Sequence, residues 1–183
     1  MSWHTILLKS LGWKIEGSFP FYEKMVIIAA PHTSAWDFVF GWLALRHFRI
    51  KPKFIIKKEY FFFPLGILLK KLGAIPIERG NIHNNMIDQM VQHFNNNKKF
   101  FLVITPEGTR KKTKHWKKGF YLIAQKANVP IIVTKLDYKN KVLGPIKEIS
   151  PHIPYNEVLK ELNICYKDVV GKKANCFDLP AYE

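Results

Sequence analysis

The strongest constraint on the fold of this chain is the alternation of short apolar runs with longer helix-like segments. Apolar runs of strand length occupy residues 25–30, 53–56, 74–77, 99–104 and 130–135. Helix-like patterns occupy residues 34–48, 64–72, 82–95, 118–127 and 156–169, and in the third of these, apolar residues recur at three- and four-residue spacing. This alternation predicts an α/β fold with a mostly parallel central sheet flanked by helices.

One domain is expected to span all 183 residues, because no linker, repeat or long low-complexity tract divides the chain. A hydrophobic content of 48% supplies enough apolar surface for a sizeable core. Beyond Tyr138, residues 141–146 are expected to form a hairpin strand at the edge of the sheet, and residues 156–169 a closing helix.

A histidine and an aspartate five residues apart follow the first apolar run, in His32-Thr-Ser-Ala-Trp-Asp37. We expect Ser34 to be the helix N-cap, so that Asp37, three residues later, reaches back toward the cap and toward His32. The carboxylate would orient the imidazole, and the imidazole would take a proton from a hydroxyl. The same Ser34-x-x-Asp37 spacing is also an ordinary capping box, so both interpretations stay open for the motif alone.

A second polar turn, Thr105-Pro-Glu-Gly-Thr-Arg110, follows the run that ends at residue 104. Proteins of the α/β class bind ligands at the carboxyl ends of their strands. Gly108 permits close backbone approach, Thr109 supplies a hydroxyl, and Arg110 offers a bidentate fork for a phosphate. The lysine-rich residues 111–118 are either a solvated basic loop or a further part of that phosphate site.

A third segment, Gly73-Ala-Ile-Pro-Ile-Glu-Arg79, ends in an arginine at what the alternation predicts to be the same edge of the sheet. Taken singly, Arg79 is either a surface charge paired with Glu78 or a second phosphate ligand. Considered together, the three segments place a base and two arginines at the ends of neighbouring strands. That combination favours deprotonation of a hydroxyl beside a bound phosphate.

Motifs of several other chemistries are missing from the sequence. There is no Gly-x-Ser-x-Gly turn and no cysteine near a histidine, so a covalent enzyme intermediate has no nucleophile. There is no Walker loop or Gly-x-Gly-x-x-Gly, so neither ATP nor a dinucleotide is expected. Cys165 and Cys176 form no zinc-binding pattern, and no metal is predicted. The remaining hypothesis is direct transfer, in which His32 deprotonates a hydroxyl that attacks an activated acyl group.

Four blocks of the chain resemble the lysophospholipid and glycerolphosphate acyltransferases in their order and spacing. The blocks are His32-x-x-x-x-Asp37, residues 73–79, Pro106-Glu-Gly-Thr-Arg110 and Val129-Pro-Ile-Ile-Val133, and the likeness covers about residues 13–138. The chain is similar to a short bacterial member of the lysophosphatidic acid acyltransferase type. The resemblance implies a glycerol-3-phosphate acyltransferase-like fold. It also implies acyl transfer to a phosphate-bearing lysolipid such as 1-acyl-glycerol-3-phosphate.

The resemblance further implies roles for single residues, with His32 as the general base and Asp37 as its orienting partner. The implied phosphate-binding residues, of which the glutamate and the glycine shape the loop, are Arg79, Glu107, Gly108, Thr109 and Arg110. The acyl donor would be an acyl carrier protein (acyl-ACP) or coenzyme A (acyl-CoA) thioester, a co-substrate, with no cofactor.

Two positions depart from the family pattern. Thr105 stands where the family usually has an aromatic residue, and Val133 where it usually has a proline. Both positions shape the pocket and neither transfers protons. A different lysolipid acceptor therefore stays open as an alternative to a glycerol-phosphate acceptor.

The charge of the chain implies a polyanionic partner, because 29 Lys and Arg against 14 Asp and Glu give a formal net charge of +15. Anionic lipid, phosphorylated substrates and nucleic acid all fit, so a non-enzymatic basic protein that binds anionic lipid or nucleic acid is the competing hypothesis. Nucleic acid is not expected, because no helix-turn-helix, zinc-finger or RNA-binding signature is present. Few cysteines and no signal peptide predict a cytoplasmic protein.

No apolar stretch approaches the roughly 20 residues that span a bilayer. The chain resembles the family's core without the N-terminal anchoring helices of many members, so we expect a peripheral protein on the inner face of the cytoplasmic membrane. Candidate contacts are the three phenylalanines at 61–63, beside pairs of lysines, and Trp3, Leu7, Leu8, Leu11 and Trp13. We expect core packing for two of the three phenylalanines.

Overall fold

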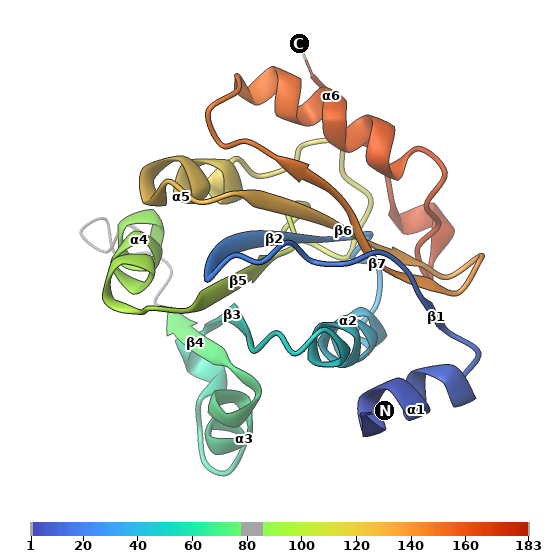
Figure 1. The fold of residues 1–183 in the computed structure, drawn as a ribbon, viewed down its shortest axis with the longest axis horizontal. Coiled ribbons are helices and arrows are strands. Elements are labelled where there is room, and N and C mark those ends of the chain that lie inside the picture. The colour runs from blue at the N-terminus through green and yellow to red at the C-terminus, as the bar shows by residue number, and fades with distance from the viewer. Residues whose placement is uncertain (1, 78–85, 183) are drawn as a thin grey trace.

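In the computed structural model, which describes residues 2–77 and 86–182, a twisted sheet runs through the centre of the molecule (Figure 1). Its seven described strands have the order β1-β7-β6-β2-β5-β3-β4. They are β1 (Lys14–Ile15), β2 (Lys24–Ala30), β3 (Pro52–Lys57), β4 (Ala74–Ile77), β5 (Phe100–Ile104), β6 (Ile131–Asp137) and β7 (Val142–Ile149). The neighbours β6, β2, β5, β3 and β4 are parallel, which confirms the predicted mostly parallel α/β fold.

The other end of the sheet differs from the prediction. Strand β7 pairs antiparallel with β6, as a hairpin strand should, but β1 pairs parallel with its outer side. The prediction of an edge strand over residues 141–146 is therefore wrong, since β7 extends to Ile149 and lies one strand in from the edge. A two-residue strand such as β1 is too short for an alternation pattern to reveal.

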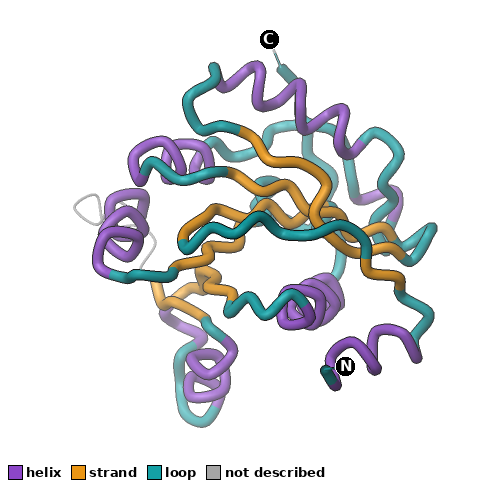
Figure 2. Tube along the Cα trace, viewed as in Figure 1, coloured by secondary structure: helices purple, strands orange, loops and turns teal. Residues whose placement is uncertain are grey.

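Helices cover both faces of the sheet (Figure 2). They are α1 (Trp3–Ser10), α2 (Trp36–His47), α3 (Leu65–Leu72), α4 (Met86–Asn96), α5 (Gly119–Ala127) and α6 (Tyr155–Tyr166), with short 3-10 turns η1 (Lys58–Tyr60) and η2 (Ala174–Cys176). Figure 1 shows α4, α5 and α6 on one side of the sheet and α1, α2 and α3 on the other. The sequence pattern does not predict α1, and residues 82–85 of the fourth predicted helix lie outside the described residues.

The pleat of β2 divides the core between these two layers. Val26, Ile28 and Ala30 pack toward α4, α5 and α6, whereas Met25 and Ile27 pack toward α2. All five side chains are almost completely buried. A strand that is buried on both faces shows a continuous apolar run in the sequence, which is the pattern that predicts β2.

Parallel pairing brings the carboxyl ends of the strands to one edge of the sheet. The register pairs Ile28 of β2 with Ile104 of β5, and Lys57 of β3 with Ile77 of β4. The last residues of β2 and β5, and those of β3 and β4, are therefore in register at the carboxyl edge of the sheet, as the alternation predicts. Arg79 itself lies outside the described residues.

Several expectations about surface residues are corrected. Phe62 and Phe63 are 59% and 83% exposed, so the expected core packing of two of the three phenylalanines is wrong. Leu8 and Trp13, proposed for membrane contact, are buried in the core beside α2. In the residues that the structure describes, none of the helices has both the length and the apolar character needed to cross a membrane.

Candidate active site

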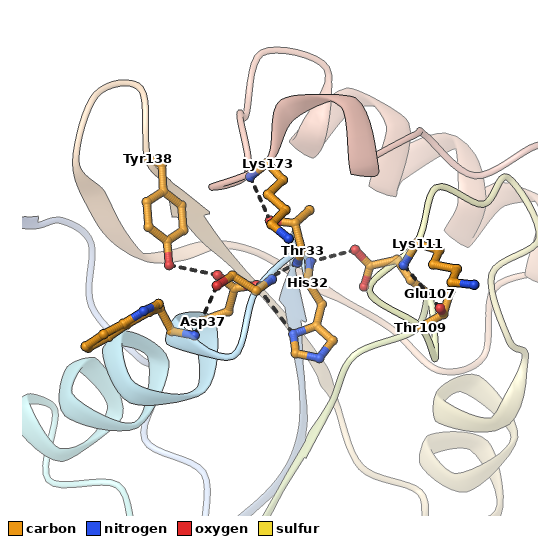
Figure 3. A network of polar contacts seen from close by, with 10 residues as sticks. His32, Thr33, Asp37, Glu107, Thr109, Lys111, Tyr138 and Lys173 are labelled. Atoms are coloured by element: carbon orange, nitrogen blue, oxygen red, sulfur yellow. Dashed lines mark hydrogen bonds and ion pairs between the residues drawn. The ribbon is translucent and has the colours of Figure 1, made fainter.

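His32 lies in the loop between β2 and α2, at the carboxyl edge of a central strand (Figure 3). Its Nδ1 atom is 3.5 Å from the Oδ2 atom of Asp37, so the fold brings the predicted pair together. The side chain of Asp37 is 4% exposed and that of His32 is 24% exposed. The imidazole can therefore meet a solute while its partner carboxylate stays shielded from water.

The Asp37 carboxylate is the polar centre of this loop. Its Oδ2 atom accepts the backbone N–H groups of Thr33 and Ser34, each at 2.6 Å, and its Oδ1 atom accepts the Tyr138 hydroxyl at 2.7 Å. Burial alone raises the pKa of Asp37, but hydrogen bonds from His32, Tyr138 and the two amides outweigh it and lower the pKa below its ordinary value. Asp37 is consequently ionised at neutral pH.

Helix α2 begins later than the sequence predicts. Its first residue is Trp36 and its N-cap is Ala35, so Ser34 is not the cap. The Oγ atom of Ser34 accepts the Trp36 N–H at 3.3 Å, while the Asp37 carboxylate reaches back to amides that precede the helix. The Asp37 carboxylate therefore orders the loop before the helix, while oxygens of Ser34 and Ala35 accept the first N–H groups of the helix itself.

A second buried carboxylate, Glu107, lies beside the backbone of His32, in the turn after β5 (Figure 3). Its Oε1 atom accepts the backbone N–H of His32 at 2.8 Å, whereas its Oε2 atom is buried and has no hydrogen-bond partner among the described residues. Burial raises the pKa of Glu107 to about 7, against the opposing effect of the His32 N–H. Glu107 thus ties the loop after β5 to the backbone of the histidine.

The residues after this glutamate form an open turn. Gly108 has φ 63°, a left-handed conformation that suits glycine, and a Cβ atom there would lie 2.7 Å from Cε of Lys117. Thr109 follows, and Arg110 is exposed. These four residues line the same pocket as His32. The predicted phosphate loop and the predicted base therefore share one cavity.

The lysine-rich segment 111–118 contains one lysine that lines the pocket and one tryptophan that is buried in the core. Of its five lysines, all within the described part of the chain, only Lys117 lines the pocket. Trp116 is buried against Tyr166 and Phe177, with ring centroids 5.7 and 6.1 Å away, and its Nε1 donates to a backbone carbonyl. Trp116 is therefore not available to stack on a nucleic-acid base.

The pocket has a volume of about 840 Å³ and lies between the sheet and helices α2 and α3. Its apolar walls include Trp42, Leu45, Phe48, Phe54, Leu65 and Leu69. Its polar lining comes from the carboxyl edge of the sheet and includes His32, Lys57, Thr109, Arg110 and Lys117. The cavity can hold an apolar chain with an anionic group beside a base, and its volume falls in the usual range of ligand sites.

Two features of the site have no signal in the sequence. Tyr138 and Asp37 stand 101 residues apart, and no local motif links them. Lys117 is indistinguishable in sequence from its exposed neighbours. Among the residues described, no group of three or more His, Cys, Asp or Glu side chains is arranged to hold a metal ion.

The carboxyl edge of the parallel sheet thus presents a His–Asp pair to a largely apolar pocket. Comparison with known families makes the class specific. The family model described as Acyltransferase matches residues 13–134. The chain therefore belongs to the Acyltransferase family, and the protein is an acyltransferase, which confirms the resemblance seen in its four sequence blocks.

A similar fold occurs in a solved structure, that of the 1-acyl-sn-glycerophosphate (LPA) acyltransferase PlsC from Thermotoga maritima. The two share 18% sequence identity with a TM-score of 0.64, over 90% of this chain and 74% of that chain. At this identity the similarity shows a shared fold. No curated protein sequence matches the chain.

Proposed function

We propose that the protein transfers a fatty acyl group from an acyl thioester to the hydroxyl of a phosphate-bearing lysolipid, such as 1-acyl-glycerol-3-phosphate. The observation that carries this proposal is the His32–Asp37 pair in a largely apolar pocket that Arg110 also lines. Its His32 Nδ1 and Asp37 Oδ2 atoms are 3.5 Å apart. Such a reaction requires a base, space for an acyl chain and a cationic site for phosphate. Membership of the Acyltransferase family supports the class of reaction.

In the proposed mechanism His32 acts as general base without a covalent enzyme intermediate. Because Nδ1 faces Asp37, Nε2 takes the proton of the acceptor hydroxyl as its oxygen attacks the thioester carbonyl. The new C–O bond forms, the tetrahedral intermediate collapses, and the C–S bond breaks. The imidazolium then returns its proton to the departing thiolate sulfur. Ionised Asp37 stabilises the imidazolium between the two proton transfers.

The acceptor phosphate is assigned to the turn after β5. Arg110 and Lys117 supply positive charge at the pocket lining, and Thr109 supplies a hydroxyl. Gly108 lets the backbone approach the ligand, and Arg79 is the second arginine of this proposed set. Glu107 is assigned a shaping role, because its carboxylate is buried against the His32 backbone. The donor is an acyl carrier protein or coenzyme A thioester.

Exposed apolar side chains support attachment to a membrane surface. They gather on α1, α2, α3 and the turn before α3, as Trp3, Ile6, Leu7, Leu11, Trp36, Phe38, Val39, Tyr60, Phe62, Phe63, Ile67 and Leu68. In the described residues of α4, α5 and α6, Ile164 alone is a large, exposed apolar residue. Lys9, Lys70 and Lys71 are exposed beside the first group. We assign this face to the anionic inner surface of the cytoplasmic membrane.

Sedimentation with lipid vesicles tests the membrane assignment. The wild type should pellet with vesicles that contain phosphatidylglycerol and much less with pure phosphatidylcholine. The double variant Phe62→Ser/Phe63→Ser should pellet less, whereas Phe21→Ser, which changes an exposed phenylalanine in the segment between β1 and β2, should behave as wild type. Equal pelleting of both variants would contradict the assignment.

Acyl transfer to lysophosphatidic acid, assayed with labelled acyl-ACP and acyl-CoA, tests the function. His32→Ala should lose nearly all turnover and keep its melting temperature, whereas His115→Ala, an exposed histidine, should retain wild-type turnover. Retention of most of the rate by His32→Ala would exclude the base assignment. No product from the wild type with either donor would point first to a different lysolipid acceptor and then to a non-enzymatic binder of anionic surfaces.

A further inference from the structure

We propose that Tyr138 is a positioning residue for acyl transfer, which holds the Asp37 carboxylate in the orientation that aligns His32. The inference rests on the proposed role of His32 as general base. Tyr138 follows the last residue of β6 and lies outside residues 13–134, the segment matched by the family model. Its role therefore follows from its place in this fold and not from the family assignment.

The two oxygens of Asp37 have different partners. Oδ1 accepts the Tyr138 hydroxyl at 2.7 Å, while Oδ2 faces the imidazole Nδ1 of His32 and two backbone amides (Figure 3). A hydrogen bond from a phenol to a carboxylate is charge-assisted and stronger than a neutral one. Burial and this bond raise the pKa of Tyr138, so its hydroxyl stays a donor. With Oδ1 held, rotation of the carboxylate away from His32 requires loss of that bond.

The phenol of Tyr138 is itself held in place. Its ring packs edge-on against Trp13 and Phe40, with centroids 5.0 and 6.0 Å away. Its backbone N–H donates to the Val170 carbonyl at 2.9 Å. The preceding residue, Asp137, is buried and accepts the N–H of Lys139, which shapes the turn between β6 and β7. Tyr138 therefore meets Asp37 from a rigid turn, as a positioning role requires.

The chain segment that binds the Tyr138 backbone also contacts the histidine loop. The Lys173 N–H donates to the Thr33 Oγ1 atom at 3.2 Å. Gly171 lies so close to this loop that a Cβ atom there would be 2.8 Å from Cγ2 of Thr33. Residues after the matched family region thus support the His32–Asp37 loop from two sides.

Tyr138→Phe tests the proposal because it removes one hydroxyl and leaves the ring. We expect kcat to fall about 10- to 100-fold, the loss typical of a hydrogen bond to a charged group, with KM for both substrates nearly unchanged. In nitrogen-15 spectra the His32 ring should lose its preference for the tautomer with hydrogen on Nδ1. The matched control is Tyr155→Phe, whose part-buried hydroxyl donates to the Trp116 carbonyl at 3.3 Å, and it should change neither quantity.

An unchanged kcat and an unchanged His32 tautomer in Tyr138→Phe would overturn the proposal. If the wild type shows no acyl transfer, the proposed function fails, while the tautomer comparison still decides whether Tyr138 positions the pair. Should Tyr138→Phe fail to fold, the Tyr138 phenol can be followed by carbon-13 labelling in Asp37→Asn at neutral pH. Loss of the charged acceptor should move the signal of the ring carbon that bears the hydroxyl, and an unmoved signal would overturn the proposal.

Discussion

Two neighbouring loops at the carboxyl edge of the sheet are built differently. The loop after β2 with the first residues of α2, residues 31–37, is bonded to three distant parts of the chain, through Glu107, Tyr138 and Lys173. The loop after β5, residues 108–118, is largely exposed. Two of its side-chain hydrogen bonds join residues two positions apart, from the Lys111 and His115 amides to the Thr109 and Thr113 hydroxyls.

The difference matches the two tasks that we assign to the loops. Proton transfer depends on short, aligned contacts, and a small misplacement of a base costs much of the rate. Charge attraction to a phosphate acts over a longer range and tolerates a mobile, solvated side chain. A rigid loop for the base and an open loop for the phosphate is therefore the arrangement that the chemistry favours. Each loop can be weakened separately.

Asp37→Asn should have the largest effect, because it breaks the rigid loop at its centre. An amide cannot accept the bonds of both backbone N–H groups and stabilise an imidazolium as an anion does. We expect kcat to fall by about 10³-fold or more, as when other carboxylates that orient a catalytic histidine are replaced by amides. Asp88→Asn, an exposed aspartate paired with Lys126, is the control and should keep full activity. A loss below tenfold would show that Asp37 does not act through His32.

Arg110→Ala should weaken the open loop without disturbing the rigid one. A charged hydrogen bond contributes about 1.5–3 kcal/mol, so KM for the acceptor should rise about 10- to 100-fold while kcat changes little. Lys112→Ala removes a charge from the same loop, but Lys112 is paired with Asp178 and does not line the pocket. The KM of Lys112→Ala for the acceptor should stay close to that of the wild type. Equal effects of the two substitutions would mean that net charge, and not a specific contact, binds the acceptor.

Glu107→Gln should have the smallest effect on activity and a pH-dependent effect on stability. The folded pKa of about 7 exceeds the ordinary value of 4.5, so the folded state holds the extra proton between these values. The free energy of unfolding should therefore fall as pH rises through this window, by up to about 3 kcal/mol. The amide side chain of the variant would keep an acceptor for the His32 N–H and remove this dependence.

Urea denaturation at pH 5 and pH 8 measures the difference between wild type and Glu107→Gln. The variant should gain stability relative to the wild type at pH 8 and differ little at pH 5. Glu148→Gln, on the exposed part of β7, serves as the control. The same pH dependence in Glu107→Gln and in the wild type would show that folding does not raise the pKa of Glu107.

Local sequence patterns predict the structure correctly where a single segment determines it. The apolar run of β2 and the polar turns after β2 and β5 predict a parallel sheet with chemistry at its carboxyl edge, and the described strands confirm the sheet. The sequence-based prediction is wrong where contacts with a distant segment determine the structure. The N-cap of α2 is Ala35 and not Ser34, and β7 pairs with the short β1 on its outer side. Leu8 and Trp13 are buried because they pack with residues of α2, whereas Phe62 and Phe63 are exposed among the residues that the structure describes.

The sequence by itself determined the α/β class, the acyltransferase resemblance and the spacing of His32 and Asp37, because periodicity and motif spacing are local properties. Only the tertiary structure decided which groups surround that pair. The Tyr138 hydroxyl, the buried Glu107 carboxylate and the amide of Lys173 reach the loop from separate turns. Their contacts depend on strand order and register, which bring distant segments together. Neither segment alone carries a sequence motif that predicts the contact.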